Sequence, residues 1–152
     1  MSDRQTPSTR DRFHVFRPLQ TRWMDTDVYG HVNNVIHYSL FDTAVNGWLM
    51  EEGLLDPRTS DSYGLVVETG CRYFAELRFP DLVTAGLRIG KLGNSSVRFE
   101  IGLFANDDQT AAAEGFFVHV YVRRDTHRPT AIDGKRRAAF EALMDDTAHR
   151  PG

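Results

Sequence analysis

The sequence lacks the features that identify disulfide-rich, membrane-spanning and secreted proteins. It has 152 residues but a single cysteine, Cys71, which excludes an intrachain disulfide and is typical of a reducing compartment. No stretch approaches the roughly 20 apolar residues that a membrane-spanning helix needs. The first twelve residues, MSDRQTPSTRDR, are charged and have no apolar core, unlike a secretory signal. We therefore expect a cytoplasmic protein that does not bind membranes.

Patterns for several other ligands are also missing. The 18 Lys and Arg are outnumbered by 21 Asp and Glu, and no basic run is long enough to follow a phosphate backbone, so we expect no nucleic-acid partner. The chain has no Walker motif, no dinucleotide-binding glycine motif and no H-E-x-x-H. His31 and His37 have no third ligand at a fitting spacing, so we expect no metal.

What is present is an ordinary globular composition, with 41% hydrophobic residues and ten Phe as bulky core material. A chain of this length buries about two-thirds of its unfolded surface, which is enough for one domain. Both ends are polar and without periodicity. We expect flexible tails over residues 1–10 and 147–152 and a single domain over residues 11–146.

The order of predicted elements indicates an α+β fold. Residues 13–23 have strand character, and Pro18 within them marks a sheet edge or a bulge. Apolar residues at helical spacing then predict a long helix from Asn33 or Asn34 to about Gly53, buried along most of its length.

Four strands follow, with turn signals at Gly93–Asn94 and at 106–108 and an expected bulge at Gly70. A short closing helix is predicted after Asp133, whose side chain can cap it. Tight hairpins require an antiparallel sheet. We expect about five twisted strands wrapped around one long helix, with self-association covering exposed edges.

The stretch RWMDTDVYGHVNN, residues 22–34, places polar groups at the start of the long helix. A carboxylate from Asp25 or Asp27 that faces the free amides of a helix N-terminus would supply the two groups needed for attack on an acyl carbonyl: a base or nucleophile and an oxyanion donor. The alternative is structural: the aspartates end a strand, Gly30 turns the chain, and the asparagines cap the helix. The pattern alone favours this second interpretation.

The same stretch, followed by a strand-rich half containing LGNSSV, resembles the hotdog-fold acyl-CoA thioesterases of the 4-hydroxybenzoyl-CoA thioesterase family. Within that family it is most similar to the branch with the signature R-W-x-D-x-D-x-x-G-H-V-N-N, and the resemblance spans about Arg12 to Leu143. It implies hydrolysis of an acyl-CoA thioester to a free acid and coenzyme A. The resemblance implies no cofactor, because coenzyme A is part of the substrate. In this family the pocket lies at a dimer interface, so a homodimer or homotetramer is expected.

The resemblance also implies roles for single residues. Asp27 matches the catalytic carboxylate, which acts as nucleophile or general base, and the backbone amide of Asn34 matches the donor that polarises the thioester carbonyl. Gly30 matches the turn glycine, and His31 and Asn33 match the signature. Asp25 is the rival carboxylate, with hydrogen bonding to turn amides as its alternative role.

Contacts to the coenzyme are less sharply indicated. Some family members carry a basic run at the hairpin beside the coenzyme A phosphates, whereas the matching KLGNSS here has only Lys91. Arg88 or Arg98 could serve instead, although both also fit ordinary solvent-facing strand positions. The backbone of Gly93, Asn94, Ser95 and Ser96 could contact the pantetheine or the phosphates.

Three other polar residues have structural interpretations. We expect Glu68 on the outer face of the sheet, paired with Arg72, and His119 as a hydrogen-bonded strand histidine. No catalytic role is indicated for Cys71.

Two other functions fit the same sequence. One is a hotdog protein that binds acyl-CoA without cleaving it, and the other is a hotdog dehydratase that uses His31. The sequence leaves open the acyl group and the choice between coenzyme A and a carrier protein.

Overall fold

The computed structural model of the protein describes residues 6–144. Of the expected tails, residues 1–5 and all of 147–152 lie outside the described residues, as do the last two residues of the expected domain. The elements are β1 (Val15–Gln20), α1 (Asn34–Glu51), β2 (Ser62–Tyr73), β3 (Leu82–Leu92), β4 (Ser96–Ala105), β5 (Ala113–Arg123) and α2 (Gly134–Ala142).

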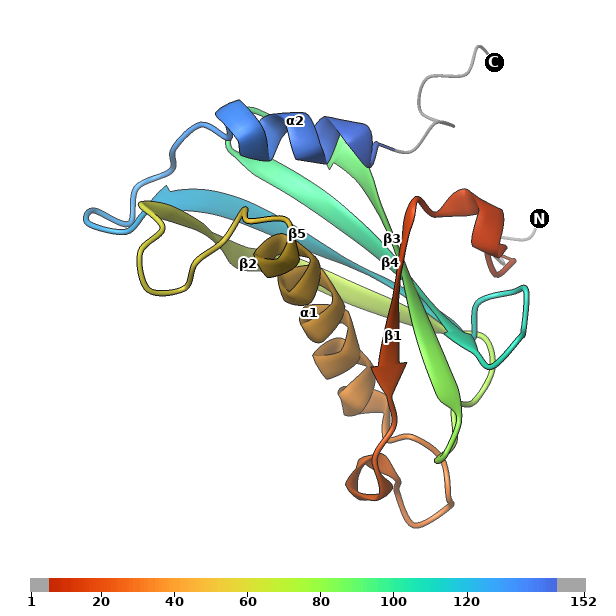
Figure 1. Ribbon diagram of the computed structural model, residues 1–152. Coiled ribbons are helices and arrows are strands. Elements are labelled where there is room, and N and C mark those ends of the chain that lie inside the picture. The colour runs from red at the N-terminus through yellow and green to blue at the C-terminus, as the bar shows by residue number, and fades with distance from the viewer. Residues whose placement is uncertain (1–5, 145–152) are drawn as a thin grey trace, which may run out of the picture.

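The five strands form one antiparallel sheet in the order β1-β3-β4-β5-β2. Figure 1 shows the sheet twisting strongly while α1 crosses one of its faces. β1 and β2 are the two edges, and Pro18 lies in β1 opposite Thr84, which confirms the edge position expected from that proline. The expected combination of one long helix and five antiparallel strands is confirmed for the described residues.

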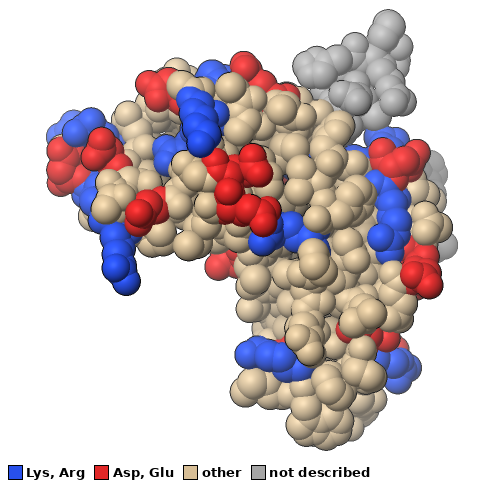
Figure 2. Space-filling model, viewed as in Figure 1, with Lys and Arg blue, Asp and Glu red and all other residues tan. Residues whose placement is uncertain are grey.

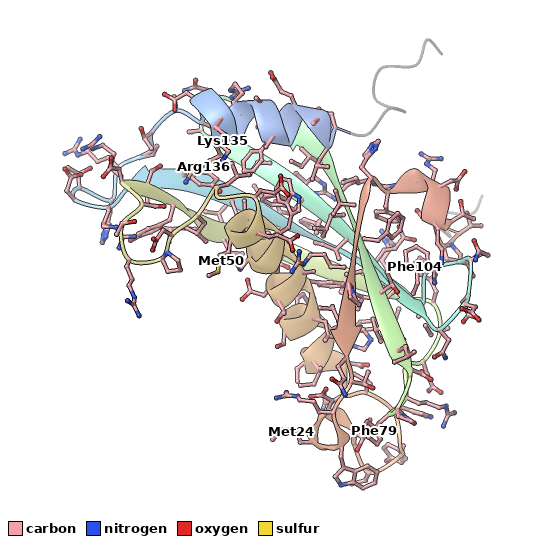
Figure 3. The ribbon with its side chains drawn as sticks, in the orientation of Figure 1. Met24, Met50, Phe79, Phe104, Lys135 and Arg136 are labelled. Carbon is pink, nitrogen blue, oxygen red and sulfur yellow. The ribbon has the colours of Figure 1, made fainter. Side chains whose placement is uncertain are left out.

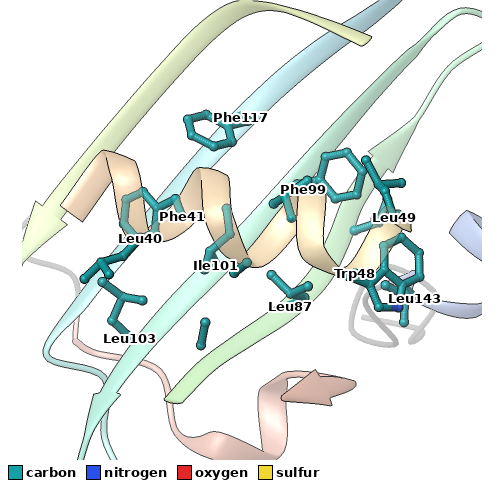
Figure 4. Packing of buried hydrophobic residues seen from close by; sticks show 14 of the residues in the cluster. Leu40, Phe41, Trp48, Leu49, Leu87, Phe99, Ile101, Leu103, Phe117 and Leu143 are labelled. Atoms are coloured by element: carbon teal, nitrogen blue, oxygen red, sulfur yellow. The ribbon is translucent and has the colours of Figure 1, made fainter. Parts of the chain in front are cut away.

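The core fills the space between α1 and the sheet. The apolar face of α1 is buried, including Phe41, Ala44 and Val45, and Trp48 packs edge-on to Phe99 with 6.5 Å between ring centroids. Figure 4 shows Phe41 and Trp48 of α1 among buried residues of the central strands, such as Ile101 and Phe99. Each fully buried Phe or Leu contributes about 1.5–3 kcal/mol, so this layer fixes the position of α1 on the sheet.

Several local predictions are wrong. The register of β2 against β5 shifts between Val66 and Glu68, not at Gly70. Gly70 instead makes room for the Phe116 ring, since a Cβ there would lie 2.7 Å from that ring. The alternation expected through Trp23 ends with β1 at Gln20, and Trp23 begins a 3-10 turn with its side chain exposed.

The two ends of the described chain add further differences. Ser8, expected in a flexible tail, donates hydrogen bonds to Glu114 from both its amide and its hydroxyl, and Arg10 N–H bonds the Gln109 carbonyl. Asp133 precedes α2 as predicted, but its side chain makes no capping hydrogen bond. No helix within residues 6–144 has the length and apolar character required to cross a membrane.

Candidate active site

The chain between β1 and α1 folds into a compact loop that Asp25 holds together. Asp25 is only 2% exposed, and its carboxylate accepts the Arg22 amide at 2.8 Å and the Arg22 guanidinium at 2.8 Å. Its backbone carbonyl accepts the Asn33 amide at 2.8 Å. Both oxygens of Asp25 are therefore committed to the loop, which matches the structural role considered for this residue.

Asp27 lies at the turn of the same loop. Its Oδ1 accepts the amides of Tyr29 at 2.9 Å and of His31 at 3.2 Å, and its own amide bonds the His31 carbonyl at 2.8 Å. Gly30 has a φ of 82°, a conformation that glycine adopts without strain. In the described part of the chain, Oδ2 of Asp27 has no hydrogen-bond partner. One carboxylate oxygen thus orders the turn while the other stays available.

The N-terminus of α1 supplies an amide that is also available. Asn33 caps the helix: its Oδ1 accepts the Val35 amide at 3.1 Å and its carbonyl accepts the Ile36 amide at 2.8 Å. The Asn34 amide has no acceptor among the described residues, as expected for the first residue of a helix. The helix dipole adds positive potential at this end, so the Asn34 amide is suited to an oxyanion.

Asp27 and Asn34 line the same pocket, which has a volume of about 400 Å³. Its wall also includes His31, His37 and the segment 73–77, which begins at the last residue of β2. The sequence predicts Asp27, His31 and Asn34 as site residues, and the structure brings all three to one cavity. Asp25 instead lines a separate small cavity with residues of β1 and α1.

The segment 73–77 holds the loop and the helix start in place. Tyr73 donates its hydroxyl hydrogen to the Asn34 carbonyl at 3.0 Å, and the Val32 amide bonds the Leu77 carbonyl at 2.7 Å. Nε2 of His31 lies 2.9 Å from a carboxylate oxygen of Glu76. Sequence reasoning missed Tyr73 and Glu76, because their only sequence signal is their position at the end of a strand.

His37, one helical turn after Asn34, is a buried part of the same wall. It is 2% exposed, and its ring packs edge-on to Tyr73 with centroids 4.8 Å apart. Burial lowers the pKa of His37, an effect that the nearby backbone of Asn33 and Asn34 partly offsets. Neither ring nitrogen has a well-formed hydrogen bond in the described structure. Burial therefore disfavours the charged form of this imidazole.

Comparison with known proteins identifies the family to which this chain belongs. Residues 21–142 match the Thioesterase-like superfamily. The chain belongs to this superfamily. No curated protein matches the sequence.

Solved structures of other members of the fold agree with the assignment. The PA5185 protein from Pseudomonas aeruginosa is 48% identical, with a TM-score of 0.88 over 93% of this chain and 98% of that one. The PA2801 protein from the same organism is 30% identical, with a TM-score of 0.76 over 82% and 95%. A 1,4-dihydroxy-2-naphthoyl-CoA thioesterase from Synechocystis is 17% identical, with a TM-score of 0.76 over 90% and 98%, and supports the fold alone. The chain therefore has the hotdog fold.

The residues predicted for coenzyme contact lie elsewhere on this thioesterase-like domain. Arg88 and Arg98 each place Nε 2.8 Å from Glu100, and all three line a groove of about 590 Å³ together with Phe13 and Phe116. This groove does not include Asp27 or Asn34. Within one chain, these arginines are not part of the candidate active site.

The predicted hairpin residues are also separate from the pocket. Lys91 is exposed near the end of β3, and the turn between β3 and β4 contains Gly93, Asn94 and Ser95, with Ser96 beginning β4. The turn's carbonyls accept hydrogen bonds from the chain itself: Arg137 donates to Gly93, the Ile132 amide to Asn94 and the Tyr121 amide to Ser95. Figure 1 shows this turn near α2. The candidate site lies away from it, at the N-terminal end of α1.

Two structural predictions need correction. Glu68 is exposed as expected, but no ion pair joins it to Arg72 in the described structure. His119 lies on β5 as expected, yet it is buried between Phe99 and Phe117, and neither ring nitrogen has a hydrogen-bond partner within residues 6–144. Local sequence shows where a strand side chain points but not whether a polar partner lies opposite.

Proposed function

We propose that this protein is an acyl-CoA thioesterase of the 4-hydroxybenzoyl-CoA thioesterase type, with Asp27 as nucleophile or general base. The observation that carries the proposal is that Asp27, with one unpaired carboxylate oxygen, and Asn34, with an unpaired amide among the described residues, line the same pocket. Membership of the thioesterase-like superfamily supports thioester hydrolysis as the general class of activity. Two proteins with the same fold are named as thioesterases acting on gentisyl-coenzyme A and on 1,4-dihydroxy-2-naphthoyl-CoA, and by analogy with them we propose a coenzyme A thioester as the substrate.

The chemistry follows from these two groups. In one route the Asp27 carboxylate attacks the carbonyl carbon, expels the coenzyme A thiolate and leaves an anhydride for water to cleave. In the other it takes a proton from a water that attacks the same carbon, and the tetrahedral intermediate then expels the thiolate, which takes up the proton. In both routes negative charge develops on the carbonyl oxygen, and the Asn34 amide stabilises it. One such donor is worth about 2.7–4 kcal/mol of barrier. Neither route needs a metal or a redox cofactor.

The site also needs protection from bulk water, which a second subunit can give. The loop beside Asp27 exposes apolar side chains, with Val28 92% and Tyr29 78% accessible. Figure 3 shows Met24 and Phe79 together at this end of the molecule, and Figure 2 shows its surface as largely uncharged, with charged side chains of both signs at its margins. We propose that the protein works as a homodimer or a tetramer, with the partner closing the pocket.

The proposed contacts to coenzyme A also involve a second subunit. Arg88, Lys91 and the turn Gly93–Ser96 lie away from the pocket of their own chain. They would reach the coenzyme of a bound substrate only across a subunit interface. This part of the proposal depends on the oligomer.

The test is hydrolysis of short, medium, long and aromatic acyl-CoAs by the purified protein, followed by detection of the free thiol. Asp27→Asn is expected to keep the fold and the oligomeric state and to lose about 10²-fold or more of kcat, because the amide neither attacks nor accepts a proton. Asp107→Asn, on the exposed turn after β4, is the matched control and should retain full activity. Near-complete activity of Asp27→Asn would exclude this carboxylate as the catalytic group.

The same assay separates the two other functions considered for the sequence. Tight binding of acyl-CoA without thiol release from any thioester would show a binding protein. An enoyl product, detected by its ultraviolet absorbance, would show a dehydratase.

A further inference from the structure

Two hydrogen bonds and one close contact between an imidazole and a carboxylate connect the segment 73–77 to the residues around the two catalytic groups of the proposed site. At one end, Tyr73 holds the Asn34 carbonyl; at the other, the Leu77 carbonyl accepts the Val32 amide. Between them, Glu76 contacts the His31 ring, and the amide of the same His31 bonds Oδ1 of Asp27. The segment therefore touches the helix start and the carboxylate turn at the same time.

We propose that Tyr73 and Glu76 are positioning residues that fix the Asn34 amide and the Asp27 carboxylate relative to each other. This inference rests on the proposed function, since it assigns these residues a part in the same reaction. Neither residue is a proton donor or a nucleophile in it. Tyr73 acts through the first turn of α1, and Glu76 acts through His31.

The loop needs such support because the bond between the Asp25 carbonyl and the Asn33 amide ties only its base to the helix cap. Val28 and Tyr29 at its apex are exposed, as is Val35 in the first turn of α1, so packing does not hold these stretches in place. A displacement of about 1 Å in a catalytic group can cost on the order of 10²-fold in rate. Bonds from a strand end that is itself paired through Tyr73–Ala113 give the loop and the helix a common support.

The chemistry of Tyr73 suits a permanent anchor. Burial raises the pKa of Tyr73 to about 12, so the hydroxyl remains a donor throughout the physiological range. Its ring packs against His37, which is buried in α1 one turn beyond Asn34. Tyr73 thus contacts the first turn of the helix through both its hydroxyl and its ring. Replacing it with Phe removes the first contact and keeps the second.

The decisive variant is Tyr73→Phe, measured on a thioester that the wild-type protein hydrolyses. We expect kcat to fall about 5- to 30-fold and KM to change less than about twofold. The lower limit is the effect of losing one hydrogen bond, and the upper limit stays below the effect of fully misplacing a catalytic group. Tyr63→Phe is the matched control: it lies on the same strand and loses a hydroxyl contact to His127 at 3.2 Å, away from the pocket. It should leave kcat unchanged.

Glu76 gives a second, independent measurement. Glu76→Ala removes the carboxylate oxygen that lies 2.9 Å from Nε2 of His31, whereas Glu76→Gln keeps a polar oxygen at that place. We expect kcat to fall about fivefold in the Ala variant, the size of one polar contact, and to recover largely in the Gln variant. Because both residues set one geometry, the double variant Tyr73→Phe, Glu76→Ala should lose less than the product of the single losses.

The outcomes are distinguishable from those of the proposed function. A wild-type protein that releases thiol from no thioester overturns the function and this inference together. An active wild type with unchanged kcat in Tyr73→Phe overturns the inference alone. A fall in kcat that is accompanied by a similar fall in melting temperature would also overturn the inference alone, since it would show a general role in stability.

Discussion

At the residue scale, two histidines in the interior have ring nitrogens without partners in the described structure. His119 is 4% exposed and packs between the rings of Phe99 and Phe117, at centroid distances of 5.3 and 5.8 Å. A buried polar group without a hydrogen bond costs about 1–3 kcal/mol. Gly64 on β2 leaves the space that the ring occupies, because a Cβ there would lie 2.8 Å from Nδ1 of His119. The space between the strands fits the neutral imidazole, whereas a charged imidazolium would be buried there without a hydrogen-bond partner among the described residues.

This burial makes stability depend on pH. It lowers the pKa of His119 from 6.5 to about 4. Because the folded-state pKa is lowered, the unfolded chain binds the proton more readily, and stability present above pH 6.5 is lost as the pH falls toward 4. The loss from His119 is about 2 kcal/mol between pH 7 and pH 5, and His37 adds to it in the same direction.

Urea unfolding at the two pH values measures this dependence. His119→Leu should be as stable as the wild type or more so at pH 5 and should show a smaller difference between pH 7 and pH 5. His14→Gln, which changes an exposed histidine, should keep the wild-type difference. If His119→Leu lost as much stability on acidification as the wild type, His119 would not be the group that titrates.

The two aspartates of the signature show how far single residues could be predicted from sequence. Their spacing left either one as the catalytic carboxylate, and only the resemblance favoured Asp27. The structure separates them by hydrogen bonding, since Asp25 is bound through both oxygens and Asp27 through one. Sequence could not show this, because both partners of Asp25, the amide and the guanidinium of Arg22, reach its carboxylate only through the 3-10 turn.

At the scale of elements, the first turn of α1 joins stability to the proposed chemistry. The cap from Asn33 satisfies the Val35 amide and its carbonyl takes the Ile36 amide, which leaves the Asn34 amide as the free donor on the pocket. Removing the cap would let the first turn fray and would disperse the direction of that donor.

Asn33→Ala tests this coupling. It should lower the free energy of unfolding by about 1 kcal/mol, the usual cost of losing a cap, and should also reduce kcat. Asn33→Ser retains an oxygen that can accept the Val35 amide, so it should recover most of both losses. Urea unfolding and thiol-release kinetics on the three proteins provide the measurement. A stability loss in Asn33→Ala with wild-type kcat would separate the cap from the catalytic donor.

The elements themselves were more predictable than their details. Helical spacing and strand alternation are local properties, so α1 and the succession of strands along the chain followed from sequence. The order of the strands within the sheet, with β2 beside β5, did not. The bulge expected at Gly70 did not, because this glycine is required by Phe116 on the neighbouring strand. The contact of Tyr73 with α1 joins residues 39 positions apart, which no local pattern records.

At the scale of the whole molecule, the two edges of the sheet differ. β1 carries Pro18, which limits pairing with a further strand. β2 is twice as long, with 12 residues against 6, and exposes Leu65, Val66 and Val67 in one run. A long apolar edge is expected to be covered in the working protein. The same strand ends at Tyr73, on the candidate pocket, so a partner paired along β2 would also reach that pocket.

Val67→Glu tests whether this edge forms the subunit interface. A carboxylate on each of two paired strands would be brought together and desolvated, so we expect the variant to be monomeric by light scattering and to lose most thiol release while remaining folded. Phe16→Glu places the same charge on an exposed side chain of the opposite edge strand and should leave both properties unchanged. An oligomeric, fully active Val67→Glu protein would require a different interface. A folded but inactive monomer would instead show that the pocket seen in one chain becomes a working site only when a second chain closes it.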